Sequence, residues 1–239
     1  MTDPNIFLSA EWRHLLMLNY EIDPSVLRPL LPAGTELDLW HGKAFVSLVG
    51  FMFLNTKVLG FPIPFHRHFE EVNLRFYTKR AHIDGERRGV TFIKEIVPRR
   101  GIAFLARHLY NENYIAMPMR HSIIQAQDQV QIEYAWKFDR RWQQFGATCK
   151  GKPAVPTKGS DEEFITEHYW GFSAQRDGSS IEYQVTHPQW RIWRTEDSVI
   201  DIDVNNLYGP DFAAYLCKPP ASSFLAEGSL VTVSKGVRF

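Results

Sequence analysis

Strict alternation of polar and apolar residues between Glu71 and Tyr77 constrains the fold of this chain more than any other feature. A period of two indicates a β-strand, in which successive side chains point to opposite faces. One face would carry Glu71, Asn73, Arg75 and Tyr77, and the other Val72, Leu74 and Phe76. The polar face either lines a cavity or meets solvent, since a strand in either setting has this pattern.

Most of the remaining chain also favours short strands separated by turn residues. We expect these strands at residues 12–21, 35–40, 43–54, 90–97, 117–123, 129–138, 143–149, 169–174, 180–186 and 198–204. His41-Gly42 predicts a hairpin turn between the second and third of them. Short helices are predicted after Asp23-Pro24, over 101–110 and over 160–167, where Ser160 and Glu163 have the spacing of a capping box.

The composition is that of a globular protein with one sizeable core. Hydrophobic residues make up 44% of the 239 residues and aromatic residues 14%, and large flat side chains suit strands and pocket walls. We therefore predict one domain over residues 1–239. The 27 basic and 27 acidic residues balance, so we expect no nucleic-acid partner.

Targeting signals and cysteines indicate a cytoplasmic protein with free thiols. The first residues lack a basic segment followed by an apolar one, and Cys149 and Cys217 cannot form a disulfide framework in so long a chain. The longest apolar stretch, residues 44–54, is too short for a bilayer helix, so we expect no membrane association. The sequence leaves a homo-oligomer possible.

Several motifs together resemble a known family. The first runs from Tyr20 through Asp23, Leu27-Arg28 and Pro32 to Glu36-Leu37-Asp38 and looks like the opening of acetoacetate decarboxylases. The others are F-H-R-H-F-E-E-V-N-L-R-F-Y, F-I-K-E-I-V-P-R-R, F-I-T-E-H-Y-W-G and S-F-L-A-E-G-S. With these, the chain resembles, nearly end to end, the uncharacterised bacterial YqjF-like proteins of the acetoacetate decarboxylase-like superfamily.

This resemblance implies an α+β fold, mostly antiparallel β, in which curved sheets form a cone or barrel with a few short helices around an internal pocket. In the decarboxylases a pocket lysine forms a Schiff base with a β-keto acid. The family arginine matches Arg13 and the family glutamate matches Glu95, but Pro98 is followed by Arg99 and Arg100 instead of the lysine. A guanidinium stays protonated and cannot attack a carbonyl, so we expect no acetoacetate decarboxylase activity.

One family carboxylate falls on Val46, and the other cannot be placed. The nearest lysine, Lys94, should lie on the strand face opposite Glu95. Lys94 and Glu95 are therefore weak catalytic candidates. The candidate ligand-binding residues are Arg13, Glu71, Asn73, Arg75, Glu95 and Arg99. Each of them also has a plain interpretation as surface charge or a solvated strand face.

Metal and cofactor chemistry has little support in the sequence. His66 and His68, followed by Glu70 and Glu71, are the right ligand types for a metal, but no partner motif follows, so we expect no metal and no cofactor. His168 offers an acid or base, although a structural histidine bonded to backbone is the more common case. Serine-hydrolase, nucleotide and thiol-redox motifs do not occur in the sequence.

Three functions therefore stay open. The chain binds a small organic acid or related apolar anion without catalysis, or it acts on keto acids by a route without an imine, or it is an interaction protein. We expect the first, with a small carboxylate as ligand, whose other end can be aromatic or apolar.

Overall fold

The computed structural model describes residues 5–63, 67–99 and 113–239. The strands are β1 (Ile6–Ile22), β2 (Glu36–Leu37), β3 (Ala44–Val58), β4 (Phe61–Pro62), β5 (Phe69–His82), β6 (Gly85–Val97), β7 (Tyr114–Ala116), β8 (Met119–Gln125), β9 (Gln129–Phe138), β10 (Arg141–Lys150), β11 (Trp170–Ala174), β12 (Ser180–Thr186), β13 (Ile192–Asp201), β14 (Ser222–Ser234) and β15 (Val237–Arg238). The helices are α1 (Pro24–Leu27) with a 3-10 turn at Arg28–Leu30, α3 (Asp161–Thr166), α4 (Val204–Tyr208) and α5 (Pro210–Leu216). The described chain is thus mostly β with a few short helices, as predicted.

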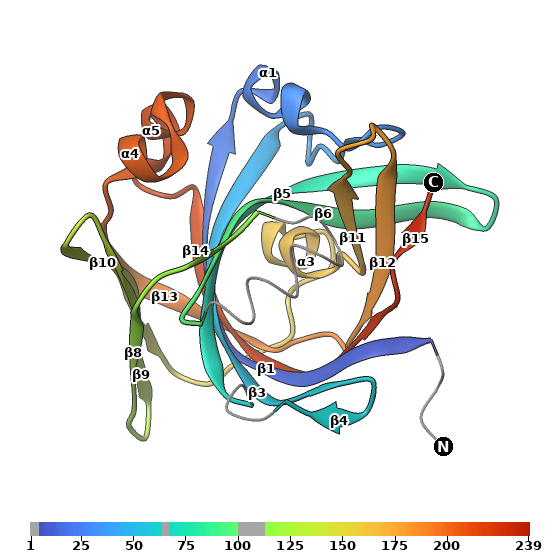
Figure 1. Cartoon of the computed structure of the whole chain (residues 1–239). Coiled ribbons are helices and arrows are strands. Elements are labelled where there is room, and N and C mark those ends of the chain that lie inside the picture. The colour runs from blue at the N-terminus through green and yellow to red at the C-terminus, as the bar shows by residue number, and fades with distance from the viewer. Residues whose placement is uncertain (1–4, 64–66, 100–112) are drawn as a thin grey trace.

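Seven of these strands close into a ring, which we call the strand ring (Figure 1). Its order is β12-β11-β6-β5-β3-β1-β14, and β14 pairs back to β12 through Val185↔Val233 and Thr186↔Thr232. The pairings in the ring are antiparallel except for the short one between β11 and β6. This architecture confirms the mostly antiparallel fold that the resemblance implied.

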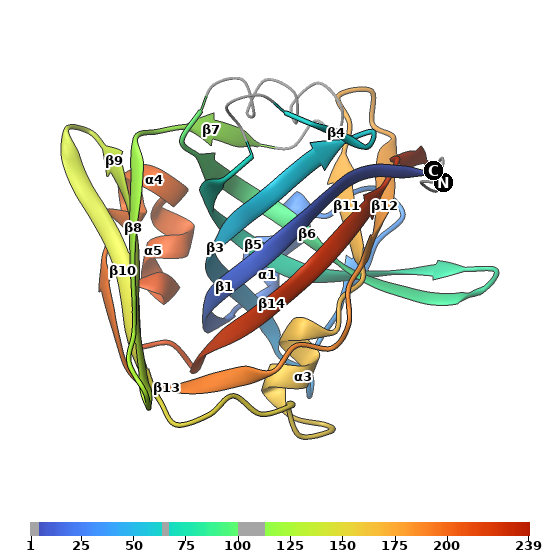
Figure 2. The same ribbon diagram turned by 90° about the horizontal axis from the view of Figure 1, so that it is seen from below.

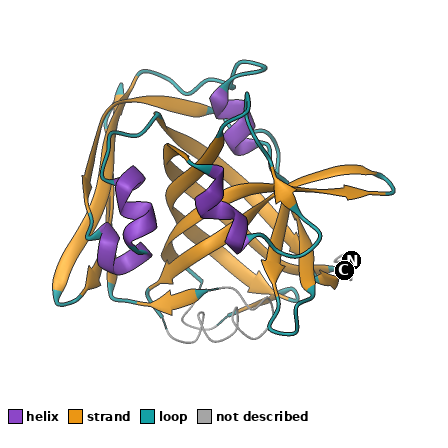
Figure 3. Cartoon of the chain, turned by 90° about the horizontal axis from the view of Figure 1, so that it is seen from above, coloured by secondary structure: helices purple, strands orange, loops and turns teal. Residues whose placement is uncertain are grey.

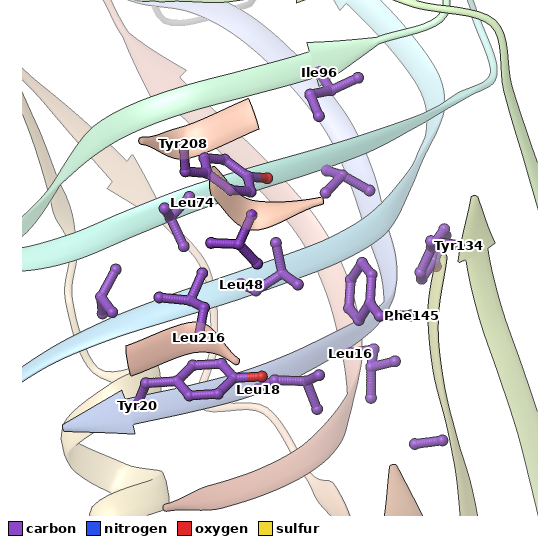
Figure 4. Close-up of a cluster of buried hydrophobic side chains, with 14 of the residues drawn as sticks. Leu16, Leu18, Tyr20, Leu48, Leu74, Ile96, Tyr134, Phe145, Tyr208 and Leu216 are labelled. Atoms are coloured by element: carbon purple, nitrogen blue, oxygen red, sulfur yellow. The ribbon is translucent and has the colours of Figure 1, made fainter. Parts of the chain in front are cut away.

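A four-stranded outer sheet continues from the ring. Its order from β14 is β13, β10, β9 and β8, and it lies to one side of the ring (Figure 2). Apolar residues on the outer face of the ring pack against this sheet and against α4 and α5 (Figure 4). We call this cluster the outer core. Gly50 on β3 allows close contact there, because a Cβ at this position would lie 2.5 Å from the Tyr134 ring and 2.7 Å from that of Phe145.

The inner face of the ring encloses a second cluster of buried apolar residues, which we call the inner core. Helix α3 covers one end of the ring: it lies at its centre in Figure 1 and at its edge in Figure 2. The helix begins at Ser160, whose Oγ accepts the Glu163 amide at 3.2 Å, so the predicted cap is confirmed. Phe164 and Ile165 are buried in the inner core, and the Phe164 ring lies 5.3 Å from that of Tyr77. An end of the ring is thus closed by the helix that the capping signal predicted.

The sequence-based boundaries need three corrections. Trp40 and Lys43 bridge the predicted His41-Gly42 turn, but residues 35–40 contribute only β2, which pairs with β5 instead of β3. The strand predicted over 198–204 ends at Asp201, because Asp203 caps α4 by accepting the Asn206 amide at 3.3 Å. Helices α4 and α5 and strand β14 were missed, and the helix predicted over 101–110 lies outside the described residues.

Strands β5 and β6 extend beyond the ring as a long hairpin (Figure 3). Glu182 of β12 pairs with Arg80 and Arg87 of this hairpin, and this contact braces its base. No helix of the described residues has the length and apolar character needed to cross a bilayer.

Candidate functional site

The polar row of β5 lies inside the strand ring. Val72, Leu74 and Phe76 belong to the outer core, so the opposite face, with Glu71, Asn73, Arg75 and Tyr77, points inward. Glu71 is 3% exposed and Asn73 2%. The alternation therefore grouped these four side chains correctly, and of the two settings that it left open, the interior one is observed.

Hydrogen bonds fix the orientation of the Asn73 amide. Its Nδ2 donates to Glu71 Oε1 at 3.1 Å, and the Tyr114 hydroxyl donates to the other Glu71 oxygen at 3.3 Å. Because Nδ2 is the amide atom that donates to Glu71, the Asn73 oxygen points away from Glu71.

Glu95 and Lys94 lie on opposite faces of β6, as predicted. Glu95 pairs directly with Asn73 and is 1% exposed, so it joins the interior row. Lys94 points to the outer core, where its Nζ donates to the Leu207 carbonyl and lies 5.6 Å from the centre of the Tyr208 ring. Burial lowers the Lys94 pKa, but the amine is on the wrong side of the sheet to reach the ring interior.

Arg75 is the cation of the interior row, and its contacts there are weak. Its Nη2 lies 3.5 Å from the Ile165 carbonyl oxygen and 3.8 Å from Met17 Sδ, and its guanidinium lies 5.8 Å from the centre of the Tyr77 ring. Its Nε is buried without an acceptor. Arg75 is half-buried, and in the described part of the chain no carboxylate forms an ion pair with it.

A β-bulge places Phe92 beside Arg75. Leu74 pairs with Lys94 but Arg75 pairs with Phe92, so Ile93 is an extra residue on β6. Ile93 and Lys94 consequently both face the outer core, and Phe92 turns inward. Strict alternation from Glu95 would have put Phe92 outside, which is why the sequence did not identify it.

A buried hydrogen-bond chain stiffens the wall next to Arg75. The Ser47 hydroxyl donates to Asn19 Oδ1 at 2.6 Å and lies 2.6 Å from the Tyr77 hydroxyl, and Asn19 Nδ2 donates to Ser222 Oγ at 3.1 Å. These residues come from β1, β3, β5 and β14, so the chain ties four strands together. Val46, which aligns with a family carboxylate, faces the outer core.

His168 follows α3 and is bonded to a carboxylate and not to backbone. Its Nε2 lies 3.0 Å from Asp38 Oδ2, and the same oxygen accepts Arg88 Nε at 2.6 Å. Burial lowers the His168 pKa to about 4, and the Asp38 hydrogen bond only partly opposes this. The imidazole is therefore neutral near pH 7, with Nε2–H donating to Asp38.

Two candidate arginines lie outside the interior. Arg13 pairs with Glu11, at 2.8 Å from Nη2, and its Nη1 donates to the Gly228 carbonyl at 3.1 Å. Arg99 is exposed beyond the end of β6. The structure therefore brings together Glu71, Asn73, Arg75 and Glu95, but not Arg13 and Arg99.

The histidine motif gives no metal geometry among the described residues. His66 lies outside them, and His68 Nδ1 accepts the Asn55 amide at 3.3 Å. No group of three or more histidine, cysteine or acidic side chains within 5–63, 67–99 and 113–239 is arranged to hold a metal ion.

The ten lysines of the chain all lie in the described ranges. The exposed ones are Lys43, Lys57, Lys137, Lys150, Lys152, Lys158, Lys218 and Lys235. Of the other two, Lys79 pairs with Glu86 on the hairpin at 2.8 Å, and Lys94 faces the outer core.

A separate hollow of about 410 Å³ lies on the outer sheet. Its walls are formed by Ser122, Ile124, Gln131, Ile132, Glu133, Gln144, Gly146, Ala147, Thr148, Asp197 and Val199. The charged residues of this lining are Glu133 and Asp197, so it offers no cation to pair with a carboxylate.

Comparison with known proteins agrees with this architecture. Residues 9–238 match the model of the DUF2071 family, described as an uncharacterized conserved protein. The uncharacterized protein YqjF of Bacillus subtilis is 27% identical over 199 residues, which cover 82% of this chain and 78% of YqjF.

Solved structures with this fold are acetoacetate decarboxylase-like. The acetoacetate decarboxylase of Legionella pneumophila is 14% identical, with a TM-score of 0.66 over 100% of this chain and 92% of its own. An acetoacetate decarboxylase-like enzyme of Sphingomonas wittichii is 13% identical, with a TM-score of 0.67 over 100% and 94%. The enduracididine biosynthesis enzyme MppR, solved with pyruvate, is 13% identical, with a TM-score of 0.66 over 100% and 91%. At these identities the likeness shows the fold alone.

Proposed function

Because the chain belongs to the DUF2071 family of uncharacterized conserved proteins, its activity has to be inferred from its own site, and we propose that it binds a small organic acid inside the strand ring. The observation that carries the proposal is Arg75, a cation of the ring interior with no ion-pair partner among the described residues. A guanidinium presents forked donors that match the two oxygens of a carboxylate. Arg75 would hold the carboxylate, with Asn73 and Glu95 beside it.

We further propose that binding involves no imine. An imine needs a neutral amine next to the carbonyl carbon, and the support is the position of the lysines: eight are exposed, Lys79 is on the hairpin and Lys94 faces the outer core. The first probes are acetoacetate and pyruvate, because the structural relatives include an acetoacetate decarboxylase and an enzyme solved with pyruvate.

Ligand-induced stabilisation tests the binding. A carboxylate that binds only the native state should raise the melting temperature in proportion to the logarithm of its concentration. Arg75→Met should weaken binding roughly tenfold or more, because a charge-assisted hydrogen bond contributes about 1.5–3 kcal/mol. Arg141→Met is the matched control, since Arg141 is exposed on β10 and pairs with Asp201. If no short carboxylate shifts the wild-type melting temperature, the binding proposal fails.

Borohydride reduction in the presence of acetoacetate tests the second part. Reduction would trap an imine as a stable mass adduct, and we expect none. An adduct on any lysine, Lys94 included, would contradict the proposed imine-free site.

Catalysis by a route without an imine is a second candidate. Glu95 and Glu71 are buried carboxylates in the same interior row as Arg75, close enough along β5 and β6 to serve a bound keto acid as base or acid. Exchange of the pyruvate methyl protons for deuterium, followed by NMR, would reveal such proton transfer, and Glu95→Gln should abolish it. An absence of exchange at saturating pyruvate would favour binding alone.

A further inference from the structure

Two interior side chains lack the partner that their chemistry usually finds. Arg75 has no carboxylate, and Phe92 has no aromatic ring in contact, among the described residues. Other aromatic side chains of the inner core do pair, such as Phe53 with Phe69 at 4.6 Å. Phe92, like the fully buried Phe224, instead packs in this core without a ring contact among the described residues.

These two side chains are direct neighbours. Arg75 and Phe92 are opposite each other in the β5–β6 register, and side chains in such pairs start about 5 Å apart at Cβ on the same face. Both remain partly exposed, while Asn73 and Tyr77, which flank Arg75 along β5, are buried. Arg75 and Phe92 are thus accessible positions in a stretch of the inner wall that is otherwise buried.

On the edge of β6 that faces away from β5, the neighbouring strands stop on either side of Phe92. Strand β11 pairs with β6 only at Gly89 and Val90, and β7 pairs with it from Glu95 onward. Between these pairings, no strand of the described chain runs beside residues 91–94 on this edge of β6, while β5 pairs along the other edge. The bulge at Ile93 then turns Phe92 from the outer core toward Arg75, and such bulges often re-aim a side chain next to a functional site.

We propose that the interior site selects aromatic carboxylic acids, with the carboxylate on Arg75 and the ring of the ligand against Phe92. This inference rests on the proposed function, since it adds a second contact to the same carboxylate site. Offset or edge-to-face packing of two rings is favourable beyond the burial of area, so Phe92 is the specificity-determining residue.

Matched ligands separate recognition of an aromatic ring from a general preference for hydrophobic ligands. Phenylacetate and cyclohexylacetate carry the same carboxylate on six-membered rings, and the saturated ring is the more apolar. We expect phenylacetate to bind roughly two- to tenfold more tightly in calorimetric titrations, the range that corresponds to an aromatic pair. Phenylacetamide, which lacks the charge, should bind at least tenfold more weakly than phenylacetate.

Variants of Phe92 test whether this residue is responsible. Phe92→Leu keeps an apolar side chain and should bring the phenyl-to-cyclohexyl ratio to about one, whereas Phe92→Tyr should retain the wild-type ratio. Phe61→Leu on β4 is the control, because Phe61 is exposed and away from the interior core. Circular dichroism of each variant checks the fold, and the wild-type ratio decides the question even if Phe92→Leu does not fold.

The outcomes distinguish this inference from the proposed function. Equal or tighter binding of cyclohexylacetate, or an unchanged preference in folded Phe92→Leu, overturns the selection of aromatic acids. Binding of pyruvate that depends on Arg75, without binding of phenylacetate, overturns it as well and leaves the carboxylate site in place. Failure of every carboxylate to bind overturns both.

Discussion

The buried His168–Asp38 pair predicts that the protein loses stability as pH falls from neutral to mildly acidic. Burial lowers the His168 pKa to about 4, whereas an unfolded histidine titrates near 6.5. The side chain is 1% exposed, so solvent screens this effect little. A group with a depressed folded-state pKa contributes stability that is present above its unfolded pKa and is lost as pH falls toward the folded one.

The magnitude follows from the difference between the two pKa values. A shift from 6.5 to about 4 corresponds to about 3 kcal/mol, which is fully present above pH 6.5 and is lost by about pH 4. Within this window the unfolded state binds about one more proton at this site, which contributes a slope of roughly 1.4 kcal/mol per pH unit. His14 and His187 also have pKa values lowered mainly by burial, so they add to the wild-type slope with the same sign.

Comparing the pH dependence of the free energy of unfolding between wild type and His168→Gln isolates the contribution of the His168–Asp38 pair. Urea unfolding at intervals between pH 4.5 and 7.5 gives the free energy of unfolding of each protein. We expect the slope of the variant to be shallower by about 1.4 kcal/mol per pH unit. His41→Gln, which alters an exposed turn, should keep the wild-type slope. Equal slopes for wild type and His168→Gln would refute the claim that His168 is buried as the neutral imidazole.

Three further substitutions test the packing and the hydrogen bonds. Gly50→Ala should destabilise the protein by about 1–3 kcal/mol, because the new methyl would overlap the Tyr134 and Phe145 rings; thermal unfolding checks this. Ser47→Ala should cost about 1–3 kcal/mol in urea unfolding, since the Asn19 oxygen and the Tyr77 hydroxyl lose their shared partner inside the ring. Ser160→Ala should cost about 1 kcal/mol through the lost α3 cap, and a smaller loss in chemical denaturation would mean that packing alone holds this helix.

Local patterns in the sequence predicted local structure well. The alternation in β5 showed which side chains share a face, and Asp23 and Ser160 marked the starts of α1 and α3, because each of these signals acts over a few residues. Helices α4 and α5 were missed, because their short apolar pattern resembled the end of a strand and their starts depend on Asp203 and on Gly209, whose φ is 100°. The predictions were thus most accurate where period or capping decides the structure.

Contacts between segments that are far apart in the chain could not be predicted from the sequence. Asp38 and His168 are 130 residues apart, and the pairing of β11 with β6 brings them within 3.0 Å. The pairing of β12 with β14 closes the ring but has no local signal in the sequence. It joins Val185 to Val233, which are neighbours in space but far apart along the chain. A single sequence gives the faces of the strands but not which strands meet.

The bulge at Ile93 shows how one unpaired residue limits predictions of a site. Alternation from Glu95 correctly placed Lys94 on the outer face, because no irregularity separates these two residues. The same rule fails from Ile93 toward the start of β6, because Ile93 has no partner on β5. Each side chain before Ile93 therefore lies on the face opposite to the one that alternation predicts. The rule would have placed Phe92 in the outer core and put the aliphatic Ile93 opposite Arg75 instead. The specificity that we propose therefore depends on a backbone irregularity that residue periodicity cannot reveal.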